Sequence, residues 1–400
     1  MGVAVAPSPA GVHLAVLPPL ALYVHFPWCV KKCPYCDFNS HQVKGEVPER
    51  DYVGALIADL ELVLPEVWGR RVYSVFFGGG TPSLFSAASI EALISAFRAR
   101  LPLAAGCEIT LEANPGTFEA AKFRGYREAG VNRLSIGIQS FNPGHLQALG
   151  RIHDDQEARR AIAIARESFD NVNLDLMYAL PGQTLEEARA DVDAALAAGT
   201  THLSFYHLTL EPNTHFFRHP PALPDDDAAA EIQEMIAAAL QGAGYVHYET
   251  SAWAKPGREC RHNLNYWRFG DYLGIGAGAH AKLSFPDRIR RSARYKQPGE
   301  YLRQAAQGLP VQEYRELGRA DLVFEFMMNA LRLTEGFAVP LFAERTGLPI
   351  TAAEKGLAEA ESRGLIERDH AQVRPTELGR RFLNDLLQLF LPEQKRGESA

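Results

Sequence analysis

The sequence predicts an α/β fold in which helices wrap a parallel sheet that forms an open or partial barrel. From Leu22 onward, short β-rich runs alternate with amphipathic helical stretches, and this order is typical of parallel strands joined by crossover helices. The first strand is not followed by a GxGxxG pattern, so a Rossmann sheet is disfavoured. The expected strands are 22–26, 72–78, 108–114, 133–139, 173–180 and 202–210, and helical runs between them include 52–64, 90–100 and 185–199.

Three segments are expected along the chain. Residues 1–21 are rich in Ala, Val and Pro and predict a flexible lead-in. Residues 22–286 hold the strand and helix repeats of the main domain. Residues 287–400 contain helical stretches at 319–333, 338–346 and 351–363 before a hairpin-like run at 364–379, an order that resembles a small winged-helix module.

Composition excludes several classes of protein. With 400 residues, 46% hydrophobic and 22% charged, the chain can build one large domain and a smaller one. Five cysteines, three of them clustered, together with no signal-like start, favour a reducing cytoplasm and a metal or redox role over disulfides. No apolar run is long enough to cross a membrane. The net charge of −7, and the excess of acidic over basic residues between Ala320 and Phe390, argue against nucleic-acid binding.

Unusual residues follow the predicted strands at their carboxyl ends. A cysteine-rich loop follows the first strand, GGGTPS (78–83) the second, and Glu112, Gln139 and Asp175 stand at the ends of later strands. Carboxyl ends of parallel strands meet at one rim, where ligands bind in such folds. We therefore expect a single cavity at this rim.

The loop CVKKCPYCDF (29–38) carries Cys29, Cys33 and Cys36 without a fourth cysteine. A [4Fe–4S] cluster is usually held by four thiolates, so three would leave one iron free to bind a small molecule. Zinc is the alternative, but a closed structural zinc site needs a fourth protein ligand, and the candidates are His41, Cys107 and Cys260.

The CxxxCxxC spacing, with Tyr35 directly before the last cysteine, resembles the radical S-adenosylmethionine (radical SAM) superfamily. This resemblance implies a [4Fe–4S] cluster whose open iron binds the amino and carboxylate groups of S-adenosyl-L-methionine. An electron passing from the cluster would then split the sulfonium and give a 5′-deoxyadenosyl radical. A protein that supplies this electron is an implied partner if the cluster is redox active.

Further motifs narrow the resemblance to the oxygen-independent coproporphyrinogen III oxidase family, whose fold is a partial (β/α)6 radical SAM barrel with a helical C-terminal domain. The matching segments are YVHFPWC (23–29), FFGGGTPS (76–83), LEANPG (111–116), SIGIQSF (135–141), LDLMYALPGQT (174–184) and EPNT (211–214). The resemblance implies that the cofactor lies near Tyr23, Tyr35, Gly79, Gly80, Thr81, Glu112, Gln139, Arg151 and Asp175.

These residue types suit the cofactor chemically. A guanidinium such as that of Arg151 can bind a carboxylate through two hydrogen bonds, and Glu112 and Gln139 can accept or donate hydrogen bonds to ribose hydroxyls. Glycines allow close approach of the backbone to a ligand, although three of them could equally form a plain tight turn. Asp175 could line the pocket or only cap the next loop.

Within that family the chain resembles the subfamily of heme chaperones more than the oxidases. The oxidases carry another cysteine where this chain has Phe38, and they have a longer N-terminal extension. The segment HNLNYW (262–267) resembles an HNxxYW motif of the chaperones. The resemblance implies a protein that binds heme and passes it to an acceptor protein. The alternative is a radical enzyme that oxidatively decarboxylates coproporphyrinogen III or acts on another tetrapyrrole.

The HNLNYW segment predicts a heme contact. His262 could offer an imidazole nitrogen to iron, and Tyr266 and Trp267 a flat apolar surface to a porphyrin. The segment read by itself is also consistent with a buried histidine beside two core aromatic residues. Other histidines remain open as iron ligands: His25, His41, His207 and His280.

Overall fold

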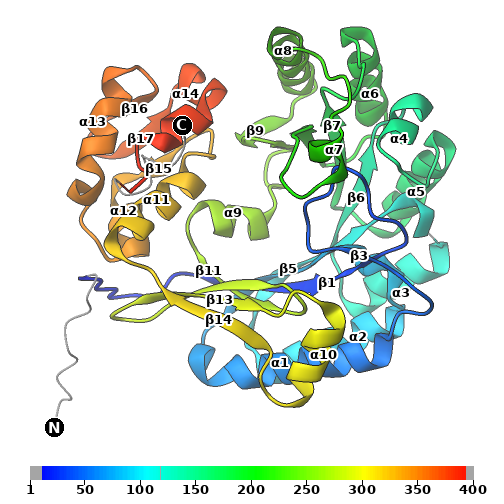
Figure 1. Cartoon of the computed structure of the whole chain (residues 1–400), viewed down its shortest axis with the longest axis horizontal. Helices are drawn as coiled ribbons and strands as arrows, with labels where there is room; N and C mark the ends of the chain where they lie inside the picture. Colours follow the sequence, from blue (N-terminus) through cyan, green and yellow to red (C-terminus); the bar gives the residue numbers. More distant parts are fainter. Residues whose placement is uncertain (1–10, 118, 393–400) are drawn as a thin grey trace.

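The computed structural model describes residues 11–117 and 119–392, and its main feature is one curved sheet of 12 strands. Seven adjacent strands of this sheet are parallel (Figure 1). In sheet order they are β11 (Asp271–Ile275), β1 (Leu20–Phe26), β4 (Val72–Gly79), β5 (Leu103–Ala113), β6 (Arg133–Gln139), β7 (Val172–Tyr178) and β8 (His202–His207).

Antiparallel strands extend the sheet at both ends. Beyond β11 lie β12 (His280–Ser284), β13 (Ile289–Arg294) and β14 (Val311–Glu316). Beyond β8 lie β10 (Ala252–Ala254) and β9 (Val246–Glu249). A separate two-stranded pair, β2 (Trp28–Cys29) and β3 (His41–Gln42), closes the base of the cysteine loop.

Residues alternate between the two faces of the parallel strands. On β5, Ile109 and Leu111 belong to the hydrophobic core under the outer helices, whereas Glu108 and Glu112 stand outside that core. Other strands place apolar residues in the same core and polar residues at the alternate positions, because side chains along a strand point to opposite faces in turn. The outer face is therefore apolar, whereas the inner face of the curve carries most of the polar side chains together with aromatic residues such as Tyr23 and Phe76.

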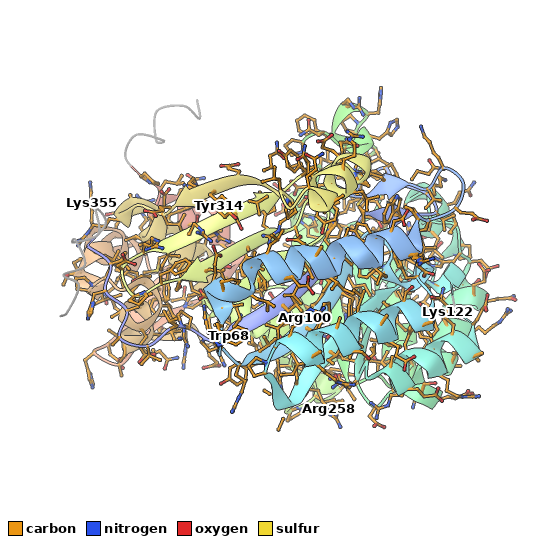
Figure 2. The ribbon with its side chains drawn as sticks, turned by 90° about the horizontal axis from the view of Figure 1, so that it is seen from below. Trp68, Arg100, Lys122, Arg258, Tyr314 and Lys355 are labelled. Carbon is orange, nitrogen blue, oxygen red and sulfur yellow. The ribbon has the colours of Figure 1, made fainter. Side chains whose placement is uncertain are left out.

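Helices cover the outer face of the sheet (Figure 1). They are α1 (Glu49–Val67), α2 (Ala87–Arg100), α3 (Ala120–Ala129), α4 (Pro143–Ala148), α5 (Asp155–Ser168), α6 (Leu185–Ala197) and α8 (Asp226–Gly242). Viewed from below, α1 and α2 cross this face, with Arg100 at the end of α2 and Trp68 just beyond α1 (Figure 2).

Three shorter helices and two 3-10 turns complete this part of the chain. Helix α9 (Arg261–Trp267) lies on the inner side of the curve and contacts β1, β4 and β11 (Figure 1). Helix α10 (Pro298–Ala306) packs against α1. Helix α7 (His215–Arg218) and the 3-10 turns at Pro82–Leu84 and Pro115–Thr117 follow strand ends near the rim.

The predicted alternation of strands and helices is confirmed, and every expected strand is present. The last one ends at His207 rather than at residue 210. Strands β9 to β14 were not predicted. Most of them are short, and β14 with its sequence VQEYRE is polar, so they carry little of the apolar pattern of a strand, whereas the five residues of β11 are all buried.

The boundary expected at residue 286 divides the main sheet. Strands β13 and β14 follow that residue and still pair with β12. The first helix of the C-terminal module begins at Arg319, so we propose a boundary near residue 317.

The expected flexible lead-in also differs from the structure where it is described. Residues 1–10 lie outside the described residues, but Val12 and Leu14 are buried in the hydrophobic cluster of the C-terminal module. The Leu14 amide donates to the Pro286 carbonyl at 3.0 Å. Residues 12–14 thus pack against a segment some 270 positions away in sequence, a contact that local composition could not indicate.

The C-terminal module has its own hydrophobic cluster, centred on Phe326, Phe337 and Phe342. Its helices are α11 (Arg319–Ala330), α12 (Val339–Thr346), α13 (Glu354–Ser362), α14 (Glu377–Arg381) and α15 (Leu383–Gln388), with a 3-10 turn at Ile350–Ala353. Its small antiparallel sheet consists of β15 (Phe337–Ala338), β17 (Gln372–Pro375) and β16 (Ile366–Arg368). Among the described helices, none is both long and apolar enough for a membrane span.

Candidate functional site

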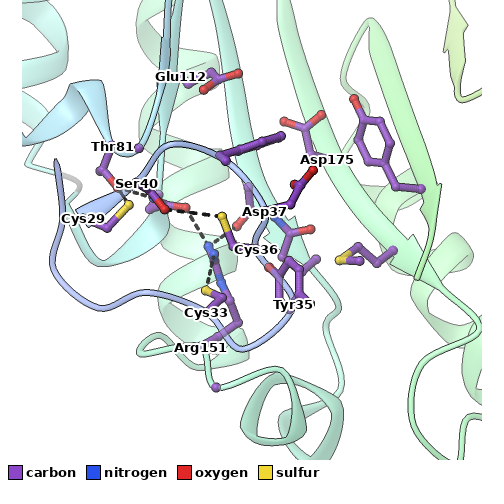
Figure 3. Close-up of a pocket in the computed structure, with 18 of the residues that line it drawn as sticks. Cys29, Cys33, Tyr35, Cys36, Asp37, Ser40, Thr81, Glu112, Arg151 and Asp175 are labelled. Atoms are coloured by element: carbon purple, nitrogen blue, oxygen red, sulfur yellow. Dashed lines mark hydrogen bonds between the residues drawn. The ribbon is translucent and has the colours of Figure 1, made fainter. Parts of the chain in front are cut away.

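A cavity of about 360 Å³ opens at the carboxyl ends of the parallel strands (Figure 3). The cysteine loop forms one wall, and the ends of β4, β5, β6, β7 and β8 form the others. Eleven residues expected to hold the cluster or its cofactor line this cavity: Cys29, Cys33, Tyr35, Cys36, Gly79, Gly80, Thr81, Glu112, Gln139, Arg151 and Asp175. Because the carboxyl ends of the parallel strands meet at one rim, residues that lie up to about 150 positions apart in sequence come together here.

The cysteine loop is held by its flanks. Asn39 donates from Nδ2 to the carbonyls of Ala277 and Lys296, each at 2.9 Å, and its own carbonyl contacts His25 Nε2 at 3.0 Å. Gly276 has φ +104°, and a Cβ there would lie 2.5 Å from the His25 carbonyl oxygen. The glycine-rich run after β11 is thus the support on which the end of the cysteine loop rests.

The GGG turn after β4 holds the other side of the loop. The Gly80 amide donates to the Phe26 carbonyl at 2.6 Å, and the Thr81 amide donates to the Trp28 carbonyl at 2.7 Å. A Cβ on Gly80 would lie 2.6 Å from the Trp28 carbonyl oxygen, and Gly79 has φ +112°. These glycines are therefore required for packing of the turn against β1 and β2, whether or not a ligand is bound.

A chain of hydrogen bonds joins two of the cysteine sulfurs. Thr81 Oγ1 donates to Cys29 Sγ at 3.4 Å and accepts from Asn114 Nδ2 at 2.8 Å. Asn114 Oδ1 accepts from Arg151 Nη2 at 2.6 Å, while Arg151 Nη1 donates to Cys33 Sγ at 3.6 Å. The third sulfur, of Cys36, contacts Ser40 Oγ at 3.5 Å. Each sulfur thus has a polar neighbour that can stabilise a thiolate.

Two partly buried carboxyl groups, those of Glu112 and Asp175, line the cavity (Figure 3). Glu112 Oε2 accepts from the Gly79 amide at 3.1 Å, and Asp175 accepts from Ser135 Oγ at 2.7 Å and from Asn173 Nδ2 at 2.8 Å. Removal from water, together with repulsion from the nearby Asp175, raises the pKa of Glu112 to about 8. Asp175 therefore lines the pocket rather than capping the next loop.

Gln139 ends β6 with φ 69°, a left-handed conformation that few residues other than glycine and asparagine adopt. The backbone turn lets its side chain line the cavity beside Gly137. Backbone strain of this kind concentrates at ligand sites, where surrounding structure holds the residue in place.

Tyr23 was expected at the cofactor but does not line the cavity. Its hydroxyl contacts His25 Nδ1 at 3.0 Å, and its ring stands against Phe76 with the ring centres 6.3 Å apart. It lies on the inner face of the sheet, between the cavity and His262, whose ring centre is 6.3 Å away. Tyr23 therefore belongs to the aromatic layer between the two sites.

His262, Tyr266 and Trp267 lie on α9 and not at the cavity. His262 is 3% exposed, its ring stacks on Phe76 at 4.9 Å, and its Nδ1 contacts Ser74 Oγ at 3.0 Å. Neither His262 Nε2 nor Trp267 Nε1 has a hydrogen-bond partner among the described residues, although both atoms are buried. Among the other histidines that were weighed, His207 lines the cavity, and its ring stacks on Tyr178 at 5.2 Å.

The extra ligands considered for zinc do not join the three cysteines. Cys107 is buried in the hydrophobic core, and Cys260 caps α9 with its thiol 3.6 Å from Glu108 Oε1. His41 Nε2 contacts Asn39 Oδ1 at 3.2 Å. Within the described residues, no three metal-binding side chains converge closely enough for a single metal ion. A cubane cluster, which is wider than one ion, fits three such cysteines on one loop better.

Several lining residues were missed by sequence reasoning. Ser135, Gly137 and Tyr206 occupy inward positions of β6 and β8, at the alternate positions that the apolar core residues leave free. Strand periodicity could have indicated these residues. Ile152 and Phe38, which are 51% and 60% exposed, form an apolar part of the cavity rim; Ile152 carries no sequence signal, and Phe38 was noted only as the position of the oxidases' additional cysteine.

Comparison with known proteins shows the family of this chain. The model of the radical SAM superfamily matches residues 23–195, and the model of the HemN C-terminal domain matches residues 317–382. The chain is 52% identical over 381 residues to the heme chaperone HemW of Escherichia coli, and the match covers 94% of this chain and 99% of that protein. The chain belongs to the HemW family. Membership of the radical SAM superfamily implies a [4Fe–4S] cluster and S-adenosyl-L-methionine.

Other relatives extend the family. The heme chaperone HemW of Haemophilus influenzae is 49% identical, with 94% of this chain and 99% of that protein covered. The mitochondrial radical S-adenosyl methionine domain-containing protein 1 of mouse is 36% identical, with 93% and 87% covered. The solved structure of coproporphyrinogen III oxidase (HemN) from E. coli superposes with a TM-score of 0.79 at 24% identity, covering 94% and 90%, and confirms the fold.

Proposed function

We propose that this protein is a heme chaperone that carries a [4Fe–4S] cluster and S-adenosyl-L-methionine, binds heme, and transfers it to an acceptor protein in the cytoplasm. The family relationship supports the general role. The observation on this chain that supports heme binding is the pair of buried, unpartnered nitrogens on α9, His262 Nε2 and Trp267 Nε1. Buried polar atoms are nearly always hydrogen-bonded, so each exception needs an explanation, and a bound ligand is the one that we propose for these two nitrogens.

The three cysteines would hold the cluster, and Glu112, Gln139, Arg151 and Asp175 would surround the cofactor. When bound, the cluster supplies an open iron for the cofactor and an electron for its reductive cleavage. The residues of this chain position these groups: Arg151 donates to Cys33 Sγ, and the partly buried carboxyl groups of Glu112 and Asp175 accept hydrogen bonds inside the cavity. A protein that donates electrons to the cluster is part of this proposal.

The α9 residues suit heme in three ways. Burial lowers the pKa of His262 to about 3, so its imidazole is neutral and keeps a lone pair. If Nδ1 donates its proton to Ser74, the unpartnered Nε2 carries that lone pair, the usual arrangement of a ligating histidine. Tyr266 and Trp267 are only partly buried and add aromatic surface beside the imidazole.

Two measurements on anaerobically reconstituted protein test this function. The first is heme retention through gel filtration, with the absorption spectrum of the bound heme. The second is turnover of coproporphyrinogen III with reductant and cofactor present. We expect stable heme binding without turnover, and conversion to protoporphyrinogen would contradict the chaperone function.

The ligand assignment needs its own pair of variants. His262→Ala should shift the heme absorption spectrum and weaken retention, whereas His207→Ala, which removes the histidine at the cavity, should leave both unchanged. The reverse result would place heme at the cavity instead of at α9.

A further inference from the structure

Helix α9 and the cofactor cavity are joined by a continuous chain of hydrogen bonds through the inside of the sheet. At the cavity, Asp175 Oδ1 accepts from Asn173 Nδ2 at 2.8 Å. Asn173 Oδ1 contacts His202 Nδ1 at 2.6 Å, and His202 Nε2 contacts the Tyr248 hydroxyl at 2.9 Å. That hydroxyl in turn accepts from the amide of Cys260, the residue that caps α9, at 3.3 Å.

The chemistry of these groups sets the direction of every hydrogen bond. Asn173 uses its amide nitrogen toward Asp175 and Ser135, so its oxygen must accept, and His202 Nδ1 must donate to it. Burial and the nearby Arg133 lower the pKa of His202 well below its usual value, so the imidazole is neutral. A neutral imidazole that donates from Nδ1 accepts at Nε2, here from the Tyr248 hydroxyl.

All donors therefore point from α9 toward the Asp175 carboxylate. The four linking residues are at most 8% exposed, so bulk water does not replace these bonds: Asn173, His202, Tyr248 and Cys260. Hydrogen bonds in such a chain polarise one another, and a change of charge or position at one end alters the strength of the bonds along it. Asp175 is the end that faces the cofactor, and the first turn of α9 is the other end.

A second contact holds the same turn of α9 to the strand that carries the other cavity carboxylate. Glu108 Oε1 accepts from the His262 amide at 3.2 Å and lies 3.6 Å from Cys260 Sγ. Glu108 and Glu112 both stand outside the hydrophobic core on β5 and are four positions apart, so they share the inner face. The start of α9 is thus tied to inner-face side chains of both β5 and β9.

We propose that Tyr248 and His202 are positioning residues that couple cofactor binding at Asp175 to the placement of α9. Cofactor that contacts the cavity carboxylates strengthens the chain and holds the first turn of α9 in the orientation that binds heme. The effect on heme rests on the proposed function: if heme binds at α9, heme and cofactor each favour binding of the other. By thermodynamic linkage the two effects are equal in size.

Amide hydrogen exchange tests the coupling without heme. In reconstituted wild-type protein, we expect S-adenosyl-L-methionine to slow exchange of amides 260–267 by about fivefold or more, the low end of typical coupling factors. In Tyr248→Phe, which keeps the ring and removes the hydroxyl, α9 should lose this response, while amides 78–81 at the cavity should still be protected by the cofactor.

Two further variants guard against a simple folding defect. His202→Asn keeps a donor toward Asn173 but removes the acceptor for Tyr248, and it should give the same loss. Tyr245→Phe is the matched control. Tyr245 is also buried, but its hydroxyl donates to the Thr200 carbonyl and takes no part in the hydrogen bonds that link Asp175 to α9. That variant should respond like wild type.

The outcomes separate this inference from the proposed function. An α9 response that is absent in wild type, or unchanged in both Tyr248→Phe and His202→Asn, would overturn the coupling. Heme binding is then measured with and without the cofactor. If wild type shows the exchange response but retains no heme, the coupling stands and the chaperone function fails. If heme binds and its affinity depends on the cofactor in wild type and Tyr245→Phe only, both stand.

Discussion

Arg151 Nη1 donates to Cys33 Sγ at 3.6 Å, while Nη2 of the same guanidinium contacts Asn114 Oδ1 and the Gly137 carbonyl at 2.6 and 2.7 Å. The side chain thus spans the space between the cysteine loop and the ends of β5 and β6. Nε of Arg151 is buried without a partner among the described residues, which leaves one donor for a ligand in the cavity. A guanidinium in this position can act on both the cluster and the cofactor.

Arg151→Ala should lower the reduction potential of the cluster, because hydrogen bonds to sulfur stabilise the reduced, more negative state. The same change should weaken binding of S-adenosyl-L-methionine by roughly tenfold, as expected for loss of one hydrogen bond to a charged group. Redox titration and calorimetry measure the two effects. Iron content should stay constant, and Arg159→Ala on the exposed face of α5 is the control. Unchanged affinity and potential would show that Arg151 serves only packing.

Replacing Cys29, Cys33 or Cys36 by alanine should remove most of the visible absorbance of the reconstituted cluster, because each supplies one of three thiolates at the cavity. Cys107→Ala should leave the absorbance intact, since Cys107 is buried in the hydrophobic core away from the cavity. Iron and sulfide analysis gives the occupancy. Loss of cluster in Cys107→Ala would mean that the ligand assignment is wrong.

Cofactor affinity should rise with pH up to about 8. The pKa of Glu112 is raised to about 8 by burial and by Asp175 on β7, while Arg133 on β6 acts in the opposite direction. The carboxyl group is therefore mainly protonated at pH 7 before binding, and a ribose that donates hydrogen bonds to it favours the ionised form. Binding then releases a proton, so affinity should increase by at most roughly tenfold per pH unit below pH 8 and level off above it.

Calorimetry in buffers of different ionisation enthalpy measures the released proton directly. Glu112→Gln has no proton to lose at this position, so its affinity should not follow the same pH dependence. An equal pH dependence in wild type and variant would assign the released proton to another group.

The buried ion pair of Asp59 and Arg294 should contribute strongly to stability. Both side chains are fully buried, and Asp59 also accepts from the Tyr301 hydroxyl and the Gly276 amide. Asp59→Ala leaves a buried guanidinium unpaired and should cost roughly 3–5 kcal/mol of unfolding free energy. Because Gly276 supports the cysteine loop, cluster retention should fall as well.

Glu61→Ala provides the comparison for Asp59, since Glu61 lies on the same helix and pairs with Arg100 at the surface. That change should cost less than about 1 kcal/mol. Denaturant unfolding of both variants measures the difference. Equal costs would show that the pair of Asp59 and Arg294 is not what holds α1 to the end of the sheet.

The repeating pattern of the sequence determined much of the fold. Strands such as 72–79 and 172–178 are buried along most of their length, so their apolar runs and the helices between them were visible in the residues alone. The cavity was predictable for the same reason. Once the strands are parallel, their carboxyl ends must share one rim, and Glu112, Gln139 and Asp175 are brought to the cysteine loop.

Tertiary structure alone decided which side chains contact one another across the sheet. The link from Asp175 to Cys260 passes through residues on β7, β8 and β9, and each of its hydrogen bonds depends on how these strands are placed next to one another. Pairing of the polar strand β14 and burial of Val12 likewise depend on partners far away in sequence. Local residue patterns set the period of a strand or helix. Only packing of the whole chain sets the distances between side chains on the inner face, and it therefore decides that α9 lies outside the cofactor cavity yet is linked to it by hydrogen bonds.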